Sequence, residues 1–202
     1  MLINGSRGRF ATFAIAVLAL TACSKKESSS TDTTAASSTV SADTSAMSAA
    51  PTAGTWTDAN ILALLDEVNA ADSTAGAVAA TKGTAAAVRD FGKRMMRDHH
   101  QLRAQGEALA KKLKVTPAAP SDDPVAPAAQ KEMDTLNSTA KGKDFDRAYI
   151  DAEVDMHKAV LDLATKASAQ TQTAELKNLI QKAAPVIQGH LDRAEAIQKT
   201  LK

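Results

Sequence analysis

Histidine and carboxylate side chains recur near the centres of four predicted helices. They are Asp72, His99, Glu153, His157 and His190. Imidazole and carboxylate are ligands for Fe, Zn, Mn and Cu, and helices that face one another in a bundle can supply them to one ion. The same groups can also satisfy one another, since a buried carboxylate that bonds a histidine avoids a desolvation penalty and helps to fix helix register. The sequence therefore permits a transition-metal site, but a structural polar layer is the simpler interpretation.

Three further polar residues are expected to support this set. Asp98 precedes His99, while Asp146 and Tyr149 share one helical face with Glu153 and His157. Di-iron bundles use a Glu-x-x-His pair on each of two helices, whereas the glutamate and histidine here are four residues apart. The sequence also lacks a Gly-rich phosphate loop and a serine nucleophile flanked by glycines. We therefore predict no catalytic residue and do not favour an enzyme.

The spacing of apolar residues predicts helices from Thr57 onward. Apolar and small side chains recur at intervals of three and four residues, which is the period of a helix with one buried face. The expected helices run from Thr57 to Gly83, from about Thr84 to Leu113, from Ala128 to Leu136, from Asp144 to Gln170 and from Thr173 to Leu201. Thr84 is expected to cap the second of these helices and Pro185 to kink the last. Four prolines between Pro117 and Pro127 leave room for only a short helix in the long link.

This order of elements predicts an all-α fold, a ferritin-like four-helix bundle with one long crossover between the second and third long helices. A plain up-down-up-down bundle, with the link folded over one end, is the alternative. The position of Asp146 separates the two topologies. It lies near Val88 and Ala79 if the crossover is present, and near Leu113 if it is not.

The N-terminal segment has the parts of a secretory signal. Arg7 and Arg9 form a basic region, Phe10–Leu20 an apolar core that is too short to span a bilayer, and small residues precede Cys23. The arrangement resembles the bacterial lipoprotein processing signal, which implies cleavage before Cys23 and acylation of the new N-terminus. Ser24 then resembles the sorting signal of an outer-membrane lipoprotein facing the periplasm. An ordinary secretory signal with an incidental cysteine is the alternative.

The chain is thus expected to comprise a signal peptide at 1–22, an acylated cysteine with a disordered Ser/Thr/Ala-rich tether at 23–55, and the bundle at 56–202. Removing the signal leaves 22 basic and 23 acidic side chains, a formal charge of −1. This balance argues against a nucleic-acid partner, which requires a basic face. Acyl chains at Cys23 would make the membrane a partner, and the sequence names no protein partner.

Several motifs together resemble one bacterial family, domain of unknown function 4142. They are Asn69-x-x-Asp72, Arg89-x-Phe91-x-x-x-Met95 with Asp98-His99, Phe145-Asp146-x-x-Tyr149 followed by His157, and Pro185 followed by His190. The resemblance covers about Thr57 to Leu201 and implies a ferritin-like bundle in a secreted or membrane-anchored protein without an established activity. The family usually has a glutamate where this chain has Asp72. We therefore expect an envelope protein that serves as a structural, interaction or stress-related module. The alternative is metal binding by the buried layer, including binding at a di-metal site of the ferritin-like kind.

Overall fold

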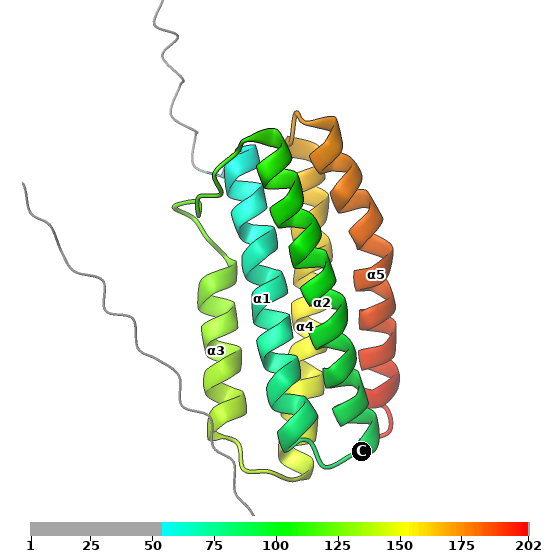
Figure 1. Ribbon diagram of the computed structural model, residues 1–202. Helices are drawn as coiled ribbons and strands as arrows, with labels where there is room; N and C mark the ends of the chain where they lie inside the picture. The colour runs from blue at the N-terminus through cyan, green and yellow to red at the C-terminus, as the bar shows by residue number, and fades with distance from the viewer. Residues whose placement is uncertain (1–53, 202) are drawn as a thin grey trace, which may run out of the picture. The chain divides into compact units, whose positions relative to one another are not determined.

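The computed structural model describes residues 54–201, and these residues form helices and no strand (Figure 1). The predicted signal peptide, Cys23 and all but the last two residues of the predicted tether lie outside the described residues. The helices are α1 (Asp58–Lys82), α2 (Ala86–Leu113), α3 (Val125–Ser138), α4 (Lys143–Gln170) and α5 (Ala174–Gln198). The all-α prediction is confirmed. No helix in this part of the chain is both long enough and apolar enough to cross a membrane.

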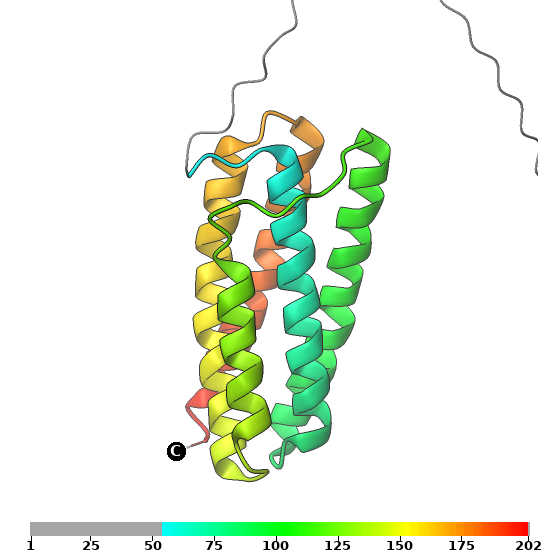
Figure 2. The same cartoon turned by 90° about the vertical axis from the view of Figure 1, so that its left-hand side faces the viewer.

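The four long helices have the connectivity predicted for a crossover. Helices α1 and α5 run in one direction and α2 and α4 in the other, so α2 and α4 are parallel (Figures 1 and 2). The shorter α3 lies in the crossover between them and packs against α1 and α4. At the turn between α1 and α2, the Asp146 carboxylate accepts hydrogen bonds from the backbone N–H groups of Thr84 and Ala85, at 2.8 and 2.7 Å. Asp146 therefore lies at the end that the crossover requires, and the up-down-up-down alternative is excluded.

Helix starts differ from the prediction in two places. Thr57 caps α1 as expected, in a capping box with Asn60. The predicted cap of α2 by Thr84 is wrong, since the N-cap is Ala85 and the Thr84 hydroxyl instead donates to Asp146. Helix α3 is longer than expected because the Asp123 carboxylate accepts from the N–H of Val125, at 2.8 Å, and starts the helix there.

Prolines in the link shorten its helix less than predicted. Pro127 lies in the first turn of α3, where its missing N–H is not needed by the helix. Helix α5 continues past Pro185, as predicted, and ends at Gln198, three residues before the predicted end. The helix of the proline-rich link was also predicted, but it is longer than expected and packs against α1 and α4.

Two apolar clusters fill the bundle, one towards each end. The first includes Ile61 and Leu176, and the second includes Phe91 and Phe145. Between them each long helix places polar residues on its buried face. Helices α1 and α2 approach very closely beside this region. A Cβ added to Gly76 would lie only 2.7 Å from the backbone oxygen of Gly92. The packing thus brings the polar residues of α1 against those of α2.

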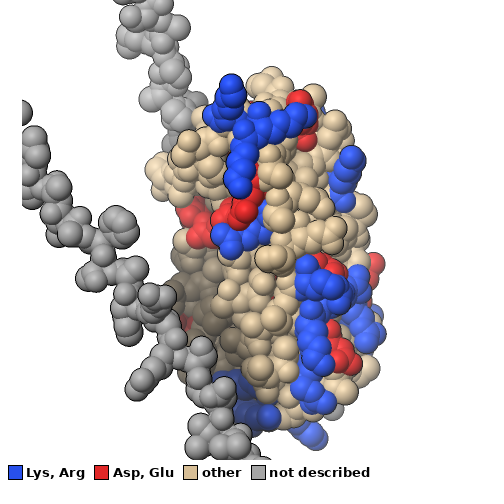
Figure 3. Space-filling model, in the orientation of Figure 1, with Lys and Arg blue, Asp and Glu red and all other residues tan. Residues whose placement is uncertain are grey.

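Basic and acidic side chains are interleaved on the face shown in Figure 3. Arg103 pairs with Asp66 at 2.7 Å between α2 and α1, and Lys93 pairs with Asp90 at 3.3 Å along α2. Such exposed pairs contribute little to stability individually.

Candidate metal centre

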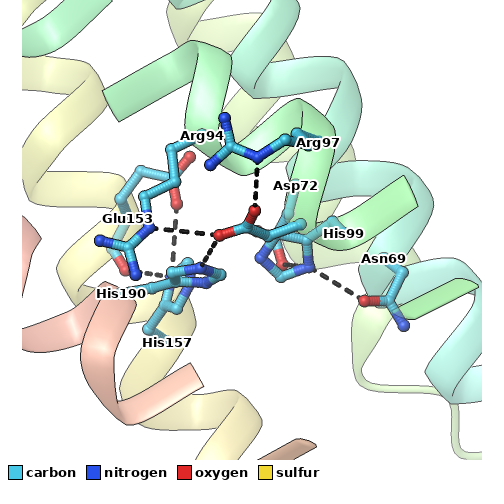
Figure 4. Close-up of polar contacts among 9 residues, drawn as sticks. Asn69, Asp72, Arg94, Arg97, His99, Glu153, His157 and His190 are labelled. Atoms are coloured by element: carbon cyan, nitrogen blue, oxygen red, sulfur yellow. Dashed lines mark hydrogen bonds and ion pairs between the residues drawn. The ribbon is translucent and has the colours of Figure 1, made fainter. Parts of the chain in front are cut away.

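Three buried histidines meet in the middle of the bundle. His99 comes from α2, His157 from α4 and His190 from α5, and none of the three side chains is exposed to solvent. Their ring centroids are 5.1–5.6 Å apart. Each ring offers a ligand nitrogen within 4.8 Å of those from the other two. We call these residues the histidine layer (Figure 4).

The acceptor beside His99 fixes the tautomer of that ring. Asn69 donates from Nδ2 to the backbone oxygen of Leu65 at 2.6 Å, so its Oδ1 faces His99. This Oδ1 lies 3.0 Å from Nδ1 of His99 and can only accept. Nδ1 of His99 therefore carries the proton, and Nε2 carries the lone pair.

The other two rings are fixed in the same way. Nδ1 of His157 lies 2.9 Å from the backbone oxygen of Glu153, which can only accept, so Nδ1 is the donor. Nε2 of His190 lies 3.0 Å from the carboxylate of Asp98, which Arg94 and Arg97 also contact at 3.2 and 3.0 Å. Partial burial raises the pKa of Asp98, but hydrogen bonds from His190 and Arg94 outweigh this effect and hold the pKa below its usual range. Asp98 is thus an ionised acceptor, and His190 donates to it.

Each ring is left with one buried nitrogen that has no hydrogen-bond partner. These atoms are Nε2 of His99, Nε2 of His157 and Nδ1 of His190. Burial lowers the pKa of His99 to about 3 and that of His157 to about 4, and it also lowers the pKa of His190 against the opposing hydrogen bond to Asp98. All three rings are therefore neutral at pH 7 and present lone pairs, the form in which imidazole binds a metal.

Three carboxyl groups lie beside the histidine layer. We call Asp72 of α1, Glu132 of α3 and Glu153 of α4 the carboxylate layer. Asp72 Oδ2 is 3.4 Å from Nδ1 of His99, and Glu153 Oε2 is 3.3 Å from Nδ1 of His157. Burial raises the pKa of Asp72 and of Glu153 well above the usual range, and raises that of Glu132 to about 7. The two layers therefore touch but differ in the chemistry they offer.

The structure brings most of the predicted residues together. Asp72 and Glu153 lie with His157 in one group of ligand atoms within 4.8 Å of one another. Asp98 is on the solvent side of His190, with its side chain 21% exposed. Tyr149 is buried, and the charge of Glu153 contributes to raising its pKa after burial itself. Asp146 does not join this group, because seven residues of helix place it about 10 Å along the axis from Glu153.

Two polar residues at the site had no role in the sequence-based prediction. Asn69 occupies the face of α1 that carries Asp72, three residues away, and this spacing was the available signal. Glu132 is one of three buried residues of α3, with Val125 and Leu136 at helical spacings on either side. This buried face was not recognised from the sequence, because only a short helix starting at Ala128 was expected, which leaves out Val125.

The histidine layer can supply three nitrogen ligands to one ion from three helices. Three protein ligands leave an open coordination position, as in catalytic zinc sites, whereas structural zinc sites use four. Each imidazole also donates its other N–H to an oxygen, which is the usual way in which proteins orient histidine ligands. The arrangement fits a transition-metal ion that favours nitrogen ligands.

The sequence matches the family described as Domain of unknown function (DUF4142) over residues 41–197. The chain belongs to this family. A search of curated proteins found no match. The resemblance seen in the sequence motifs is thus confirmed.

Two solved structures share the fold at low sequence identity. One, titled "CopM in the Cu(II)-bound form", has a TM-score of 0.60 and 13% identity, and covers 73% of this chain and 99% of its own. The other, a DUF305 fragment from Deinococcus radiodurans, has a TM-score of 0.62 and 12% identity, and covers 71% of this chain and 95% of its own. Both likenesses establish the helical-bundle fold.

Proposed function

We propose that this protein binds a transition-metal ion through His99, His157 and His190, and that copper is the preferred ion. One observation carries the proposal, namely the three buried imidazole nitrogens that lack partners while their sister nitrogens are held by obligate acceptors. A buried polar atom left unpaired is destabilising. A purely structural layer would pair these atoms with one another or with side chains, whereas a bound ion satisfies all three together.

The choice of copper follows from the donor set. Imidazole suits Zn, Cu, Fe and Ni, while Mn favours oxygen ligands, and divalent copper binds more tightly than the other first-row ions to most such sites. CopM, the similar bundle described above, was solved with Cu(II) bound. That likeness supports the fold as a suitable scaffold, and the choice of ion rests on the three nitrogens.

Equilibrium dialysis of the untagged full chain against Cu²⁺ tests the proposal. We expect one ion per chain in the wild type, and an affinity more than about 100-fold weaker after His157→Leu, because loss of a ligand should exceed the 10–100-fold effect of losing an outer partner. His100→Leu is the matched control, since His100 is exposed on α2 next to His99. Cys23→Ala controls for the only thiol in the sequence. Equal binding by the wild type and His157→Leu would contradict the proposal.

Thermal unfolding separates metal binding from a structural role. At a free metal concentration 100 times the dissociation constant, binding to the folded state adds about 2.7 kcal/mol to the free energy of unfolding. For a domain of this size that raises Tm by about 5–10 °C. His190→Gln should remain folded and show almost no metal-dependent shift, whereas a structural layer predicts no shift in either protein.

We further propose that the protein is a lipoprotein of the cell envelope, anchored in the outer membrane through Cys23. The proposal rests on the sequence signal, and three acyl chains would bind a bilayer far more firmly than the single chain that binds reversibly. Palmitate labelling should mark the wild type, whereas Cys23→Ala should accumulate as an unlabelled precursor. A processed Cys23→Ala protein together with an unlabelled wild type would reject the anchor.

A further inference from the structure

The carboxylate layer is a second group of buried polar atoms without partners. Both carboxylate oxygens of Asp72, both of Glu153 and Oε1 of Glu132 are buried and make no hydrogen bond. The Tyr149 hydroxyl is buried beside them and also lacks a partner. Tyr149 and Glu153 are fully buried, Asp72 is 1% exposed and Glu132 is 7% exposed. Four oxygen-bearing side chains from three helices are thus withheld from water.

No basic side chain of residues 54–201 balances these carboxylates. The ion pairs in this part of the chain that involve Asp72 and Glu153 are the contacts to His99 and His157, at 3.4 and 3.3 Å. In both histidines the Nδ1 that makes this contact already donates to another oxygen, Oδ1 of Asn69 for His99 and the backbone oxygen of Glu153 for His157, at 3.0 and 2.9 Å. A buried carboxylate normally requires a cation or a proton. Protonation would remove the charge but would still leave most of these oxygens without partners, whereas a bound cation would satisfy charge and oxygens together.

The position of Glu132 on α3 indicates that the buried carboxylates form a binding site and are not brought together only by packing. It packs on the outside of α1 and α4, and most of its residues are exposed, yet Glu132 points inward beneath it. Ligand atoms of Asp72 and Glu153 lie within 4.8 Å of each other, and the buried Oε1 of Glu132 belongs to the inner face of the helix that packs against both α1 and α4. The crossover therefore delivers a third carboxylate to a place where two are already buried.

We propose that Asp72, Glu132 and Glu153, with the Tyr149 hydroxyl, form a second cation site that takes a divalent ion favouring oxygen ligands, with Mn²⁺ as the best match. Carboxylate oxygens select Mn, Mg and Ca over ions that favour nitrogen. Mg²⁺ retains several waters, and Ca²⁺ takes six to eight oxygens, whereas this enclosed set offers fewer. The site goes beyond the copper proposal and stands on separate atoms, so the bundle would hold two unlike ions side by side.

Electron paramagnetic resonance of Mn²⁺ tests this site, because the signal of the free ion disappears on binding. The untagged full chain, first dialysed against a chelator, should bind one Mn²⁺ with a dissociation constant below about 1 mM, the weak limit for oxygen-ligand sites in proteins. Glu132→Gln removes one charge with little change of shape and does not alter a group that contacts the histidines. It should weaken Mn²⁺ binding at least about tenfold, because ligand charge sets affinity at such sites. Asp134→Asn, at an exposed position of α3, should bind as the wild type does.

Variants of the two layers distinguish this inference from the copper proposal. His190→Gln should lose Cu²⁺ and keep Mn²⁺, whereas Glu132→Gln should keep Cu²⁺ affinity within about threefold and lose Mn²⁺. If the wild type and His190→Gln bind Mn²⁺ while Glu132→Gln does not, but the wild type binds no Cu²⁺, the copper proposal fails and the second site stands. The second site is rejected if the wild type binds no Mn²⁺ below about 1 mM, or if Glu132→Gln and Glu153→Gln both bind it as the wild type does.

Discussion

The histidine layer and the carboxylate layer respond to burial in opposite directions. Desolvation disfavours charge of either sign, so it lowers the pKa values of His99 and His157 and raises those of Asp72 and Glu153. Both layers are therefore driven towards neutrality by the same apolar surroundings. Neutral imidazole is ready to bind a metal, whereas a protonated carboxyl group must first lose its proton.

The layers also differ in how their polar atoms are held. Each histidine has an oxygen acceptor on one nitrogen, which fixes the direction of the lone pair on the other. The carboxylates have only the long contacts to the histidines. Burial thus creates the demand for a ligand, and an outer hydrogen-bond partner decides how far the site is organised before the ligand binds.

Among the groups that surround the metal ligands, the largest effect is expected from removing an acceptor of the histidine layer. Asp98→Ala should weaken Cu²⁺ binding by about 10–100-fold, because His190 loses the group that fixes its tautomer and ring orientation. Isothermal titration calorimetry measures the change. Asp90→Ala, which removes an exposed carboxylate from the same helix, is the matched control. An affinity within twofold of the wild type would show that the outer partners do not organise the site.

The metal-free protein should show opposing pH dependences in the two layers. The folded-state pKa values of His99 and His157 lie below the value of 6.5 for the unfolded chain, so their contribution to stability is present above pH 6.5 and is lost as the pH falls towards 4 and 3. The pKa of Glu132, about 7, lies above its unfolded value of 4.5. Its contribution is therefore present below pH 4.5 and is lost as the pH rises towards 7. Each group changes the free energy of unfolding by up to about 1.4 kcal/mol per pH unit.

Glu132→Gln should remove one of the carboxyl contributions that oppose the histidines. Between pH 4.5 and 6.5 the slope of its free energy of unfolding against pH should be more positive than that of the wild type, by up to about 1.4 kcal/mol per unit, while Asp72 and Glu153 still titrate in both proteins. Urea denaturation across this range in the presence of a chelator measures the slopes, with Asp134→Asn as the control. Parallel slopes for Glu132→Gln and the wild type would mean that Glu132 does not titrate as its burial requires.

The smallest effect is expected from the Tyr149 hydroxyl. Tyr149→Phe removes a buried hydroxyl that has no partner, so the metal-free protein should be unchanged or more stable by up to about 1 kcal/mol. Mn²⁺ binding should weaken only a few-fold, because a neutral oxygen is a weaker ligand than a carboxylate. Urea denaturation and Mn²⁺ titration of the same samples give both values. A loss of more than about 1 kcal/mol would reveal a hydrogen bond that the static structure lacks.

The fold followed from the sequence because helical periodicity and one long link leave few topologies. Apolar spacing located all four long helices to within about three residues at each end. The crossover was a choice between two alternatives, and the contact of Asp146 with Thr84 and Ala85 decided it. Helix α3 was underestimated because prolines were expected to break it, although one of them lies in a first turn that tolerates proline.

The candidate site was only partly predictable. Residue types and positions along each helix were enough to bring His99, His157 and His190 to one level. The tautomers depend on acceptors that a sequence does not reveal, such as the backbone oxygen of Glu153. Glu132 was missed because its partners come from α1 and α4, and a short amphipathic helix in a link gives no sign of which helices it will cover.

X-ray absorption at the copper edge can show whether His99, His157 and His190 bind one copper ion together. The untagged full chain with Cys23→Ala, loaded with one equivalent of Cu²⁺, has no thiol to compete for the ion. We expect outer-shell scattering from three imidazole rings around one copper, falling to two in the His190→Gln protein. Scattering from one ring or none in the parent protein, or the same spectrum in both, would show that the histidine layer does not bind the ion.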